Sequence, residues 1–203
     1  MKTLIFATGN AHKAYEVRKM LEGLDVEVLT LHEAGLDLNI VEDGTTFREN
    51  SLIKARAVFA ASGKAVLADD SGLEIEALGG APGVYSARYM GEETSYEFKC
   101  DAILRLLERV PESRRGADYR CVAAFIRPGR WKKAVVKTAE GRVDGRVAYE
   151  QAGRYGFGYD PIFYLPEEGC PMAELPDEIK NNISHRGRAI RAILPEIRKW
   201  LNQ

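Results

Sequence analysis

Val66-Leu67-Ala68-Asp69-Asp70-Ser71-Gly72-Leu73 joins a short apolar run to two carboxylates, a hydroxyl and a glycine. The apolar part, residues 65–68, predicts a buried strand that ends at the acidic pair. Ligands of α/β proteins bind at strand ends, because loops there project from a rigid support. Neighbouring side chains of an extended chain point to opposite sides, so at most one of the two acids faces a given ligand directly. Asp, Ser and Gly also favour a simple turn, and this stretch alone leaves both interpretations open.

Length and composition predict one soluble α/β domain over residues 1–203. A chain of 203 residues buries a substantial core, and shares of 45% hydrophobic and 29% charged residues are typical of a globular protein. The net charge of −1 offers no global attraction for nucleic acid polymers or membrane surfaces. No apolar run approaches the roughly 20 residues of a membrane span. The three scattered cysteines lack CxxC spacing, which favours free thiols in a reducing cytoplasm.

Hydrophobic periodicity predicts a βα pattern in the first half of the chain and a strand-rich second half. Strands are expected at 3–7, 26–31 and 65–68, with helices at 11–21 and from about 46 to 61. A helix is expected at 94–110, with Ala102, Ile103, Leu106, Leu107 and Val110 facing inward. It precedes strands at 119–126, 131–139 and 141–147, which predict an antiparallel meander and hence a mixed sheet. The last helix has the apolar stripe Ala189, Ile190, Ile193, Leu194, Ile197, Trp200 and Leu201.

The segment Thr8-Gly9-Asn10-Ala11-His12-Lys13 lies between the first strand and the first helix. Thr8 or Asn10 can cap the helix, whereas Lys13 in the first turn opposes the helix dipole. A helix N-terminus that carries Thr, Asn and Lys is suited to binding phosphate. The GxxxxGK[ST] spacing of a P-loop is absent, and a capped helix with a solvated lysine explains the segment equally well.

Residues 41–50 form a second junction between a loop and a helix. Thr45 or Thr46 can cap the helix, and Glu49 stands three residues after Thr46, which predicts a structural capping box. Glu42 precedes the helix, where its carboxylate could bind a divalent cation together with Asp70. Lys54 and Arg56 follow on the helix, where one of them could face the same cleft, although a solvated helix face is the default expectation for both.

Two later segments combine aromatic, acidic and basic residues. Residues 156–163, Gly-Phe-Gly-Tyr-Asp-Pro-Ile-Phe, offer aromatic faces that could stack on a base, although a tight turn would explain the glycines and the proline, but not the acid. Lys180, His185 and Arg186 gather before the last helix, with Ser184 as its expected N-cap. Cations at a helix start are unfavourable unless an anion binds there. Acids for Mg²⁺, cations for phosphates and aromatics for a base together predict metal-assisted chemistry on a nucleotide polyphosphate.

Six segments, in order from residue 8 to residue 186, resemble the inosine triphosphate pyrophosphatase family in its bacterial form. They are Thr8–Lys13, Glu42–Asn50, Ala68–Leu73, Gly83–Tyr89, Phe157–Pro161 and Ser184–Arg186. The resemblance implies hydrolysis of ITP, dITP and XTP to the monophosphate and pyrophosphate, with Mg²⁺ as cofactor and a homodimer as assembly. It also implies a mixed α/β fold, with an elongated central sheet flanked by helices and two lobes around an active-site cleft.

The same resemblance assigns roles to individual residues. Asp70 would be the general base and a magnesium ligand, and Glu42 the second acidic ligand; the sequence alone does not decide between Asp69 and Asp70. Substrate contacts are implied for Thr8, Gly9, Asn10, Ala11, His12, Lys13 and Ser71 at the phosphates and sugar, for Phe157, Gly158, Tyr159 and Asp160 around the base, and for Lys180, His185 and Arg186. Donors aimed at O6, from His185, Arg186 or backbone amides, would favour a 6-keto purine over adenine.

Two other interpretations remain. A pyrophosphatase of related fold could act on pyrimidine or modified nucleotides. A non-catalytic signalling module is the second alternative, because receiver domains also have an acidic pair at a strand end. In receiver domains, however, the pair ends the first strand, and no aromatic base-binding loop is expected.

Overall fold

The computed structural model describes residues 1–130 and 133–203, and the chain packs into two compact units. Unit 1 contains residues 1–70, 121–141 and 186–203; unit 2 contains residues 71–120 and 142–185. Trp131, the first residue of a predicted strand, lies outside the described residues. A single functional domain over residues 1–203 stays a prediction.

The strands form a seven-stranded sheet in the order β2-β1-β3-β4-β5-β6-β7. β1 pairs in parallel with β2 and β3, whereas β5, β6 and β7 pair antiparallel. The predicted mixed α/β class is therefore confirmed. The strands are β1 (Lys2–Phe6), β2 (Val26–Leu29), β3 (Ala65–Ile75), β4 (Gly116–Pro128), β5 (Ala134–Val147), β6 (Phe163–Leu165) and β7 (Cys170–Pro171).

The helices begin where the sequence supplies capping groups. The side chain of Asn10 accepts a hydrogen bond from the Lys13 amide at the start of the first helix, and Thr46 forms the predicted capping box with Glu49. The α-helices are α1 (Ala11–Met20), α2 (Phe47–Ser62), α3 (Tyr96–Leu106), α4 (Asp177–Ile183) and α5 (His185–Leu201). Short 3-10 turns lie at Glu76–Leu78, Gly83–Tyr85, Glu112–Arg114, Asp160–Ile162 and Met172–Glu174.

Three expectations about these elements are wrong. β3 does not end at the acidic pair but continues to Ile75, and both carboxylates pair with lysines of neighbouring helices. The strands expected at 131–139 and 141–147 form one described strand from Ala134 to Val147, with Gly141 kept in the extended backbone. Leu106, expected to face inward from the third helix, is 54% exposed.

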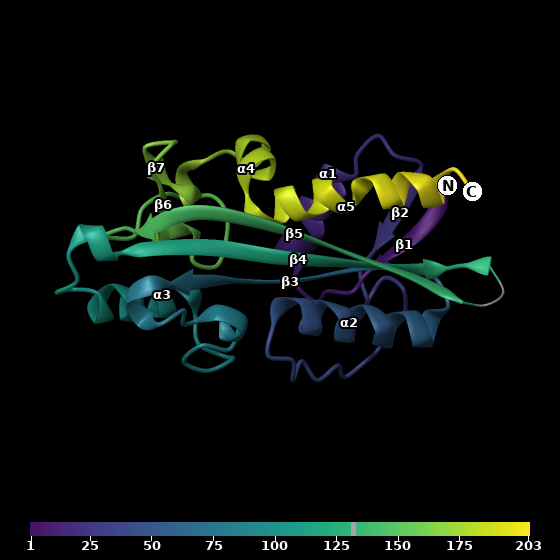
Figure 1. Ribbon diagram of the computed structural model, residues 1–203, viewed down its shortest axis with the longest axis horizontal. Helices are drawn as coiled ribbons and strands as arrows, with labels where there is room; N and C mark the ends of the chain where they lie inside the picture. Colours follow the sequence, from purple (N-terminus) through teal and green to yellow (C-terminus); the bar gives the residue numbers. More distant parts are fainter. Residues whose placement is uncertain (131–132) are drawn as a thin grey trace. The chain divides into compact units, whose positions relative to one another are not determined.

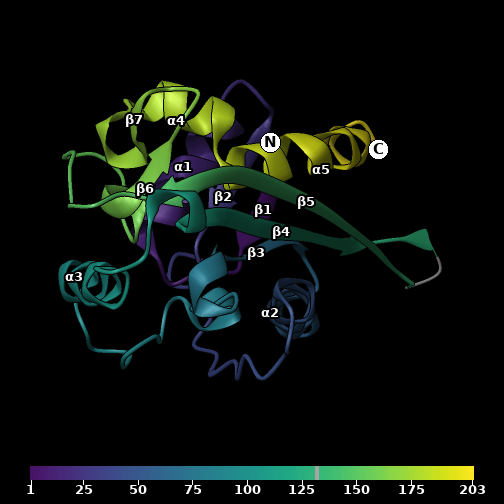
Figure 2. The ribbon, with the colours of Figure 1, turned by 60° about the vertical axis from the view of Figure 1, so that its left-hand side comes forward.

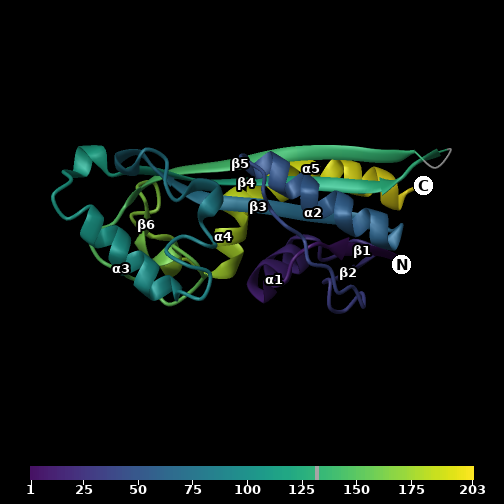
Figure 3. The ribbon, with the colours of Figure 1, turned by 90° about the horizontal axis from the view of Figure 1, so that it is seen from below.

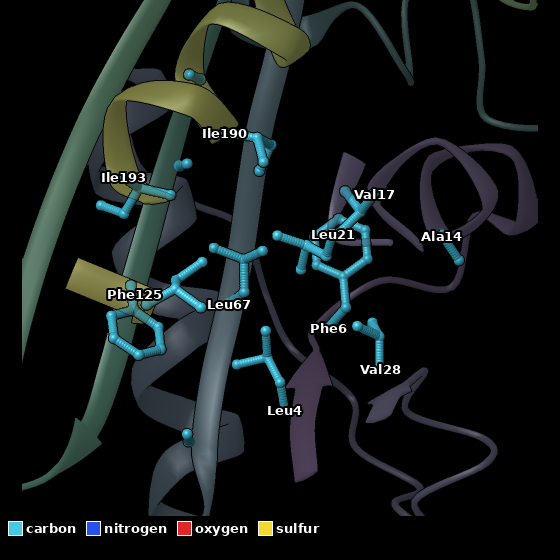
Figure 4. Close-up of a cluster of buried hydrophobic side chains, with 14 of the residues drawn as sticks. Leu4, Phe6, Ala14, Val17, Leu21, Val28, Leu67, Phe125, Ile190 and Ile193 are labelled. Carbon is cyan, nitrogen blue, oxygen red and sulfur yellow. The ribbon is translucent and has the colours of Figure 1, made fainter. Parts of the chain in front are cut away.

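Apolar side chains cover both faces of the unit 1 strands. On one face, Leu4, Phe6 and Leu67 pack against Val17 of α1 and Ile193 of α5 (Figure 4). On the other face, side chains of β1, β3 and β4 pack against Ala55 and Val58 of α2. Figures 1 and 2 show α5 and α2 on opposite sides of these strands, and Figure 3 shows α1 beside β1 and β2.

Unit 2 has an apolar core of its own. Leu73 and Ile75 of β3 and Ile103 of α3 are fully buried there, together with Phe163 of β6. Tyr159 belongs to the same core, so the loop before β6 rests on packed side chains. Among the described residues, no helix is both long and apolar enough to cross a membrane.

Candidate active site

Asp69 and Asp70 are consecutive residues of β3, and their side chains contact different elements of unit 1. Asp69 meets Lys13 of α1 and Arg186 of α5, whereas Asp70 meets residues of α2. This is the alternation that an extended strand imposes on neighbouring residues. The two carboxylates are 1% and 8% exposed, respectively, so each depends on protein groups to compensate the cost of burial.

Asp70 lies in a polar cluster with three other side chains, of which Asn50 and Lys54 are buried and Glu42 is partly exposed. Asn50 Nδ2 donates to Asp70 Oδ2 over 3.2 Å, and Lys54 Nζ lies 3.4 Å from Asp70 Oδ1. The same ammonium lies 2.6 Å from Glu42 Oε2. Burial raises the pKa of Asp70, and Lys54 opposes this shift only in part. The Asp70 carboxylate is therefore more basic than that of an exposed aspartate, and its contacts with Asn50 and Lys54 fix its position.

The loop that carries Glu42 is tied to α2 through Asn50. Asn50 Oδ1 accepts a hydrogen bond from the Gly44 amide at 2.9 Å. A Cβ atom at Gly44 would lie 2.6 Å from that oxygen, so a larger residue there would displace the contact. Asn50 therefore holds two groups in place: its carbonyl oxygen accepts from the loop, and its NH₂ group donates to the Asp70 carboxylate.

Asp69 forms a second buried cluster with cations from two helices. Lys13 Nζ lies 3.1 Å from Asp69 Oδ2, and Arg186 Nε donates to the same oxygen at 3.1 Å. Arg186 also donates to Glu16 Oε2 at 2.5 Å. Burial pushes the pKa of Asp69 upward, but Lys13 and Arg186 outweigh it and hold that pKa well below its usual range. Asp69 is therefore ionised and saturated with donors, which separates its role from that of Asp70.

The loop after β1 begins beside the acidic pair. Phe6 pairs with Leu67, and the Ala7 amide donates to the Leu67 carbonyl at 2.8 Å, two residues before Asp69. Thr8 Oγ1 accepts from the Asn10 amide, and Asn10 caps α1. The side chains that follow, Ala11 and His12, are exposed. Ser71 follows Asp70 along β3.

The loop of residues 156–160 in unit 2 is held at several points. The Asp160 carboxylate accepts from the Phe157 amide at 2.8 Å and from Lys180 Nζ at 2.8 Å. The Gly158 carbonyl accepts from the Cys100 thiol at 3.7 Å. Burial raises the pKa of Cys100 to about 12, so the thiol keeps the proton that it donates.

The two aromatic residues of this loop differ in exposure. Tyr159 is 2% exposed, and its hydroxyl donates to the Ser86 carbonyl at 2.8 Å, so its ring supports the loop from within the core. The ring of Phe157 is partly exposed, with Lys180 Nζ 4.8 Å from its centroid. Phe157 is therefore the ring of this loop with a surface that a planar ligand can reach.

The donors around Lys54 fit a divalent cation. Among the described residues, no group of three or more His, Cys, Asp or Glu side chains is placed to hold a metal ion. Glu42 and Asp70 nevertheless converge on one ammonium, so this position already accommodates a positive charge. Mg²⁺ is typically held in proteins by one or two carboxylates, with substrate phosphates and waters as the other ligands. Glu42 and Asp70 would supply the two carboxylate ligands that a protein typically contributes to such a site.

A family model described as the Ham1 family matches residues 4–196 of the chain. The chain belongs to the Ham1 family. Among the relatives of this member, the "dITP/XTP pyrophosphatase" of Bacillus subtilis is 45% identical over 95% of this chain and 96% of its own length. The protein of the same name from Photorhabdus laumondii is 41% identical over 98% of this chain and 99% of its own.

Solved structures agree with this membership. The HAM1 protein from Coxiella burnetii, 37% identical, superposes with a TM-score of 0.86 over 98% of this Ham1 chain and 100% of its own. The Ham1 protein of Staphylococcus aureus gives a TM-score of 0.85 at 37% identity, covering 98% of this chain and 99% of its own. The family assignment made from the six sequence segments is confirmed.

The default expectation of a solvated helix face was wrong for one of two charged side chains on α2 in this Ham1 member. Lys54 is buried between carboxylates, whereas only Arg56 has the expected solvated position. Lys180 lies on α4 and pairs with Asp160, while Arg186 pairs with Asp69 and Glu16. Lys180 in α4 and Arg186 in the first turn of α5 therefore both have protein carboxylates as partners, and ligand binding by this cluster stays a prediction.

Sequence reasoning did not identify Asn50 or Glu16, both of which contact predicted site residues. A signal for Asn50 was available. Asn50 and Lys54 are four residues apart on α2, which places two polar side chains on one helix face among buried apolar neighbours. For Glu16 no comparable signal exists, because its partner lies 170 positions away along the chain.

Proposed function

We infer that this Ham1 family member is a nucleoside triphosphate pyrophosphatase acting on non-canonical purine nucleotides, with dITP, XTP and ITP as substrates. The reaction is hydrolysis of the α–β phosphoanhydride bond, which gives the nucleoside monophosphate and pyrophosphate. The names of the full-length relatives support this activity. The observation that carries the assignment to a site is the polar cluster of buried Asp70, Asn50 and Lys54 with partly exposed Glu42.

Asp70 is the proposed general base. A water molecule that attacks phosphorus must lose a proton, and a carboxylate with an elevated pKa accepts that proton more readily than an exposed one. Asn50 fixes Oδ2 of Asp70 through its amide donor, so the carboxylate has one preferred orientation. Lys54 favours the ionised form of Asp70, which is the form a base requires.

Glu42 and Asp70 are the proposed ligands of Mg²⁺. When bound, the ion supplies charge neutralisation at the phosphate oxygens. The protein's own contribution is to hold two carboxylate oxygens around one point, with Glu42 kept there by the contact between Asn50 and the Gly44 amide.

The proposed substrate contacts divide by chemistry. Thr8 to Lys13 and Ser71 would bind the phosphates and sugar, because helix α1 begins there and its first turn carries a lysine. Phe157 to Asp160, with Lys180, His185 and Arg186, would bind the base. A 6-keto purine accepts a hydrogen bond at O6, and a donor left unpaired by adenine would cost on the order of 1–3 kcal/mol.

The proposal includes a homodimer. Large apolar side chains that remain exposed mark candidate contact surfaces. On α3, Phe98 is 55% exposed and Leu106 is 54% exposed, and a spacing of eight residues places them on the same side of the helix, about two turns apart. A cytoplasmic location also stays a prediction.

Pyrophosphate release tests the activity directly. It should be measured with ITP, dITP, XTP, GTP, ATP and dUTP, each with Mg²⁺ and with EDTA. Metal-dependent release from the first three, far above GTP and ATP, is expected. A preference for dUTP would keep the phosphate chemistry and overturn the purine assignment. No release from any nucleotide would favour the non-catalytic alternative.

A further inference from the structure

We propose that Tyr119 is a positioning residue for base selectivity, holding both the 156–160 loop and the imidazole of His185 in place. This inference rests on the proposed function, which assigns the loop and His185 to the base. None of the sequence segments that indicated the family contains Tyr119, which lies on β4.

Tyr119 contacts both elements directly. Its phenol oxygen accepts a hydrogen bond from the Tyr159 amide at 3.1 Å, so it holds the backbone of the loop. Its ring stacks on the His185 ring with centroids 4.4 Å apart and planes 5° from parallel. A Cβ atom at Gly158 would lie 3.9 Å from the same hydroxyl, which places that oxygen next to the loop. One side chain thus connects two parts of the proposed base site.

The hydroxyl of Tyr119 is not required for packing. The side chain is 6% exposed and packs edge-on against Phe163, with ring centroids 4.7 Å apart. Phenylalanine would fill this space, and a buried hydroxyl destabilises a core unless it is hydrogen-bonded. The Tyr119 hydroxyl accepts its hydrogen bond from the Tyr159 amide of the loop, and this buried amide would lose that partner in a phenylalanine variant. Burial raises the pKa of Tyr119 well above its ordinary value, so the hydroxyl is neutral at neutral pH.

The stacked pair fixes the plane of the His185 ring. A parallel arrangement at this distance restricts rotation of the imidazole, and His185 is 4% exposed. Because an imidazole hydrogen bond is directional, the ring plane sets where its nitrogen atoms point. The phosphate chemistry is assigned to other residues, so loss of this restraint should alter base recognition more than turnover.

Tyr119→Phe and Tyr119→Leu separate the two contacts. Tyr119→Phe keeps a ring for His185 and removes the bond to the Tyr159 amide, and we expect KM for XTP and dITP to rise about 10-fold, with kcat within about twofold. Tyr119→Leu also removes the stack on the His185 ring, and we expect this variant to lose part of the preference for XTP over ATP in addition to the rise in KM. Tyr164→Phe makes the same change on β6, keeps the ring that packs against Arg146, serves as the matched control and should behave as wild type.

A spectroscopic measurement tests positioning without any substrate. The chain has three histidines, so the imidazole proton resonances of His185 can be assigned by substitution of the other two. Stacking on a phenol ring should shift those resonances upfield in the wild type and in Tyr119→Phe, and Tyr119→Leu should abolish the shift. Unshifted resonances in the wild type would overturn the proposal, whatever the activity proves to be.

The kinetic results can also overturn it. Wild-type KM and selectivity in Tyr119→Phe would show that the bond to the loop has no part in recognition. A fall in kcat that is equal for all nucleotides, with selectivity unchanged, would indicate a general structural role instead. If the wild-type enzyme releases no pyrophosphate from XTP or dITP, the proposed function fails, and the resonances of His185 still decide whether Tyr119 positions that ring.

Discussion

At the scale of single residues, the acidic pair shows that two identical side chains in sequence acquire different chemistry from their neighbours. Asp69 is surrounded by Lys13 and Arg186, so its pKa is lowered, whereas burial raises the pKa of Asp70.

We expect Asp70→Asn to reduce kcat by about 10²–10⁴-fold, because the amide cannot accept the proton of the attacking water. Pyrophosphate release measures this loss, and thermal unfolding should show a retained fold. Asp144→Asn, on an exposed side chain, is the control, and near-wild-type turnover of Asp70→Asn would refute the assignment.

Asn50 provides a prediction about pH. Its hydrogen bond lowers the pKa of Asp70, so Asn50→Ala should raise that pKa further. A general base is active when deprotonated, and the acidic limb of the profile of kcat/KM against pH should therefore move to higher pH. The same variant leaves the Gly44 amide without its recorded partner, which should destabilise the protein by about 1–3 kcal/mol. An unmoved acidic limb would mean that Asp70 is not the group whose titration controls the rate.

At the scale of elements, Asp69 and Glu16 connect β3 and α1 to the first turn of α5 through Arg186. Removing one partner of a buried ion pair leaves a charge without compensation, and we expect Asp69→Asn to destabilise the protein by about 3 kcal/mol at pH 7. Because the pKa of Asp69 is lowered by folding, its contribution is complete above the ordinary aspartate pKa of about 4 and is lost as the pH falls toward the lowered value.

Urea unfolding at two pH values checks this prediction. The difference in unfolding free energy between wild type and Asp69→Asn should be smaller at pH 3 than at pH 7. A difference that does not depend on pH would show that packing around Asp69, and not its charge, accounts for the stability. Asp144→Asn again controls for the loss of an exposed carboxylate.

At the scale of the whole molecule, local patterns predicted the elements better than the pairing between them. The caps at Asn10 and Thr46 depend on residues three positions away. Asn10 was predicted as one of two candidate caps, and Thr46 was predicted through its capping box with Glu49. The burial of Lys54 depends on carboxylates that no local pattern connects to it, so the default of a solvated helix face was wrong. The continuation of β3 beyond the acids had the same origin, because charges remain inside a sheet only when distant partners neutralise them.

The proposed homodimer is a property of the whole molecule that the exposed apolar side chains of α3 make testable. An exposed apolar face on α3 is unfavourable in a monomer, and a second copy of the chain could cover it. The helix carries Glu97 in its first turn and Arg105 in its last turn, so antiparallel packing against the same helix of another copy would place these opposite charges together. We expect light scattering to give twice the monomer mass for the wild type, and Phe98→Glu to give the monomer mass. Val41→Glu, at an exposed apolar position in unit 1, should remain dimeric. A dimeric Phe98→Glu would move the interface away from α3, and a monomeric wild type would contradict the dimer itself.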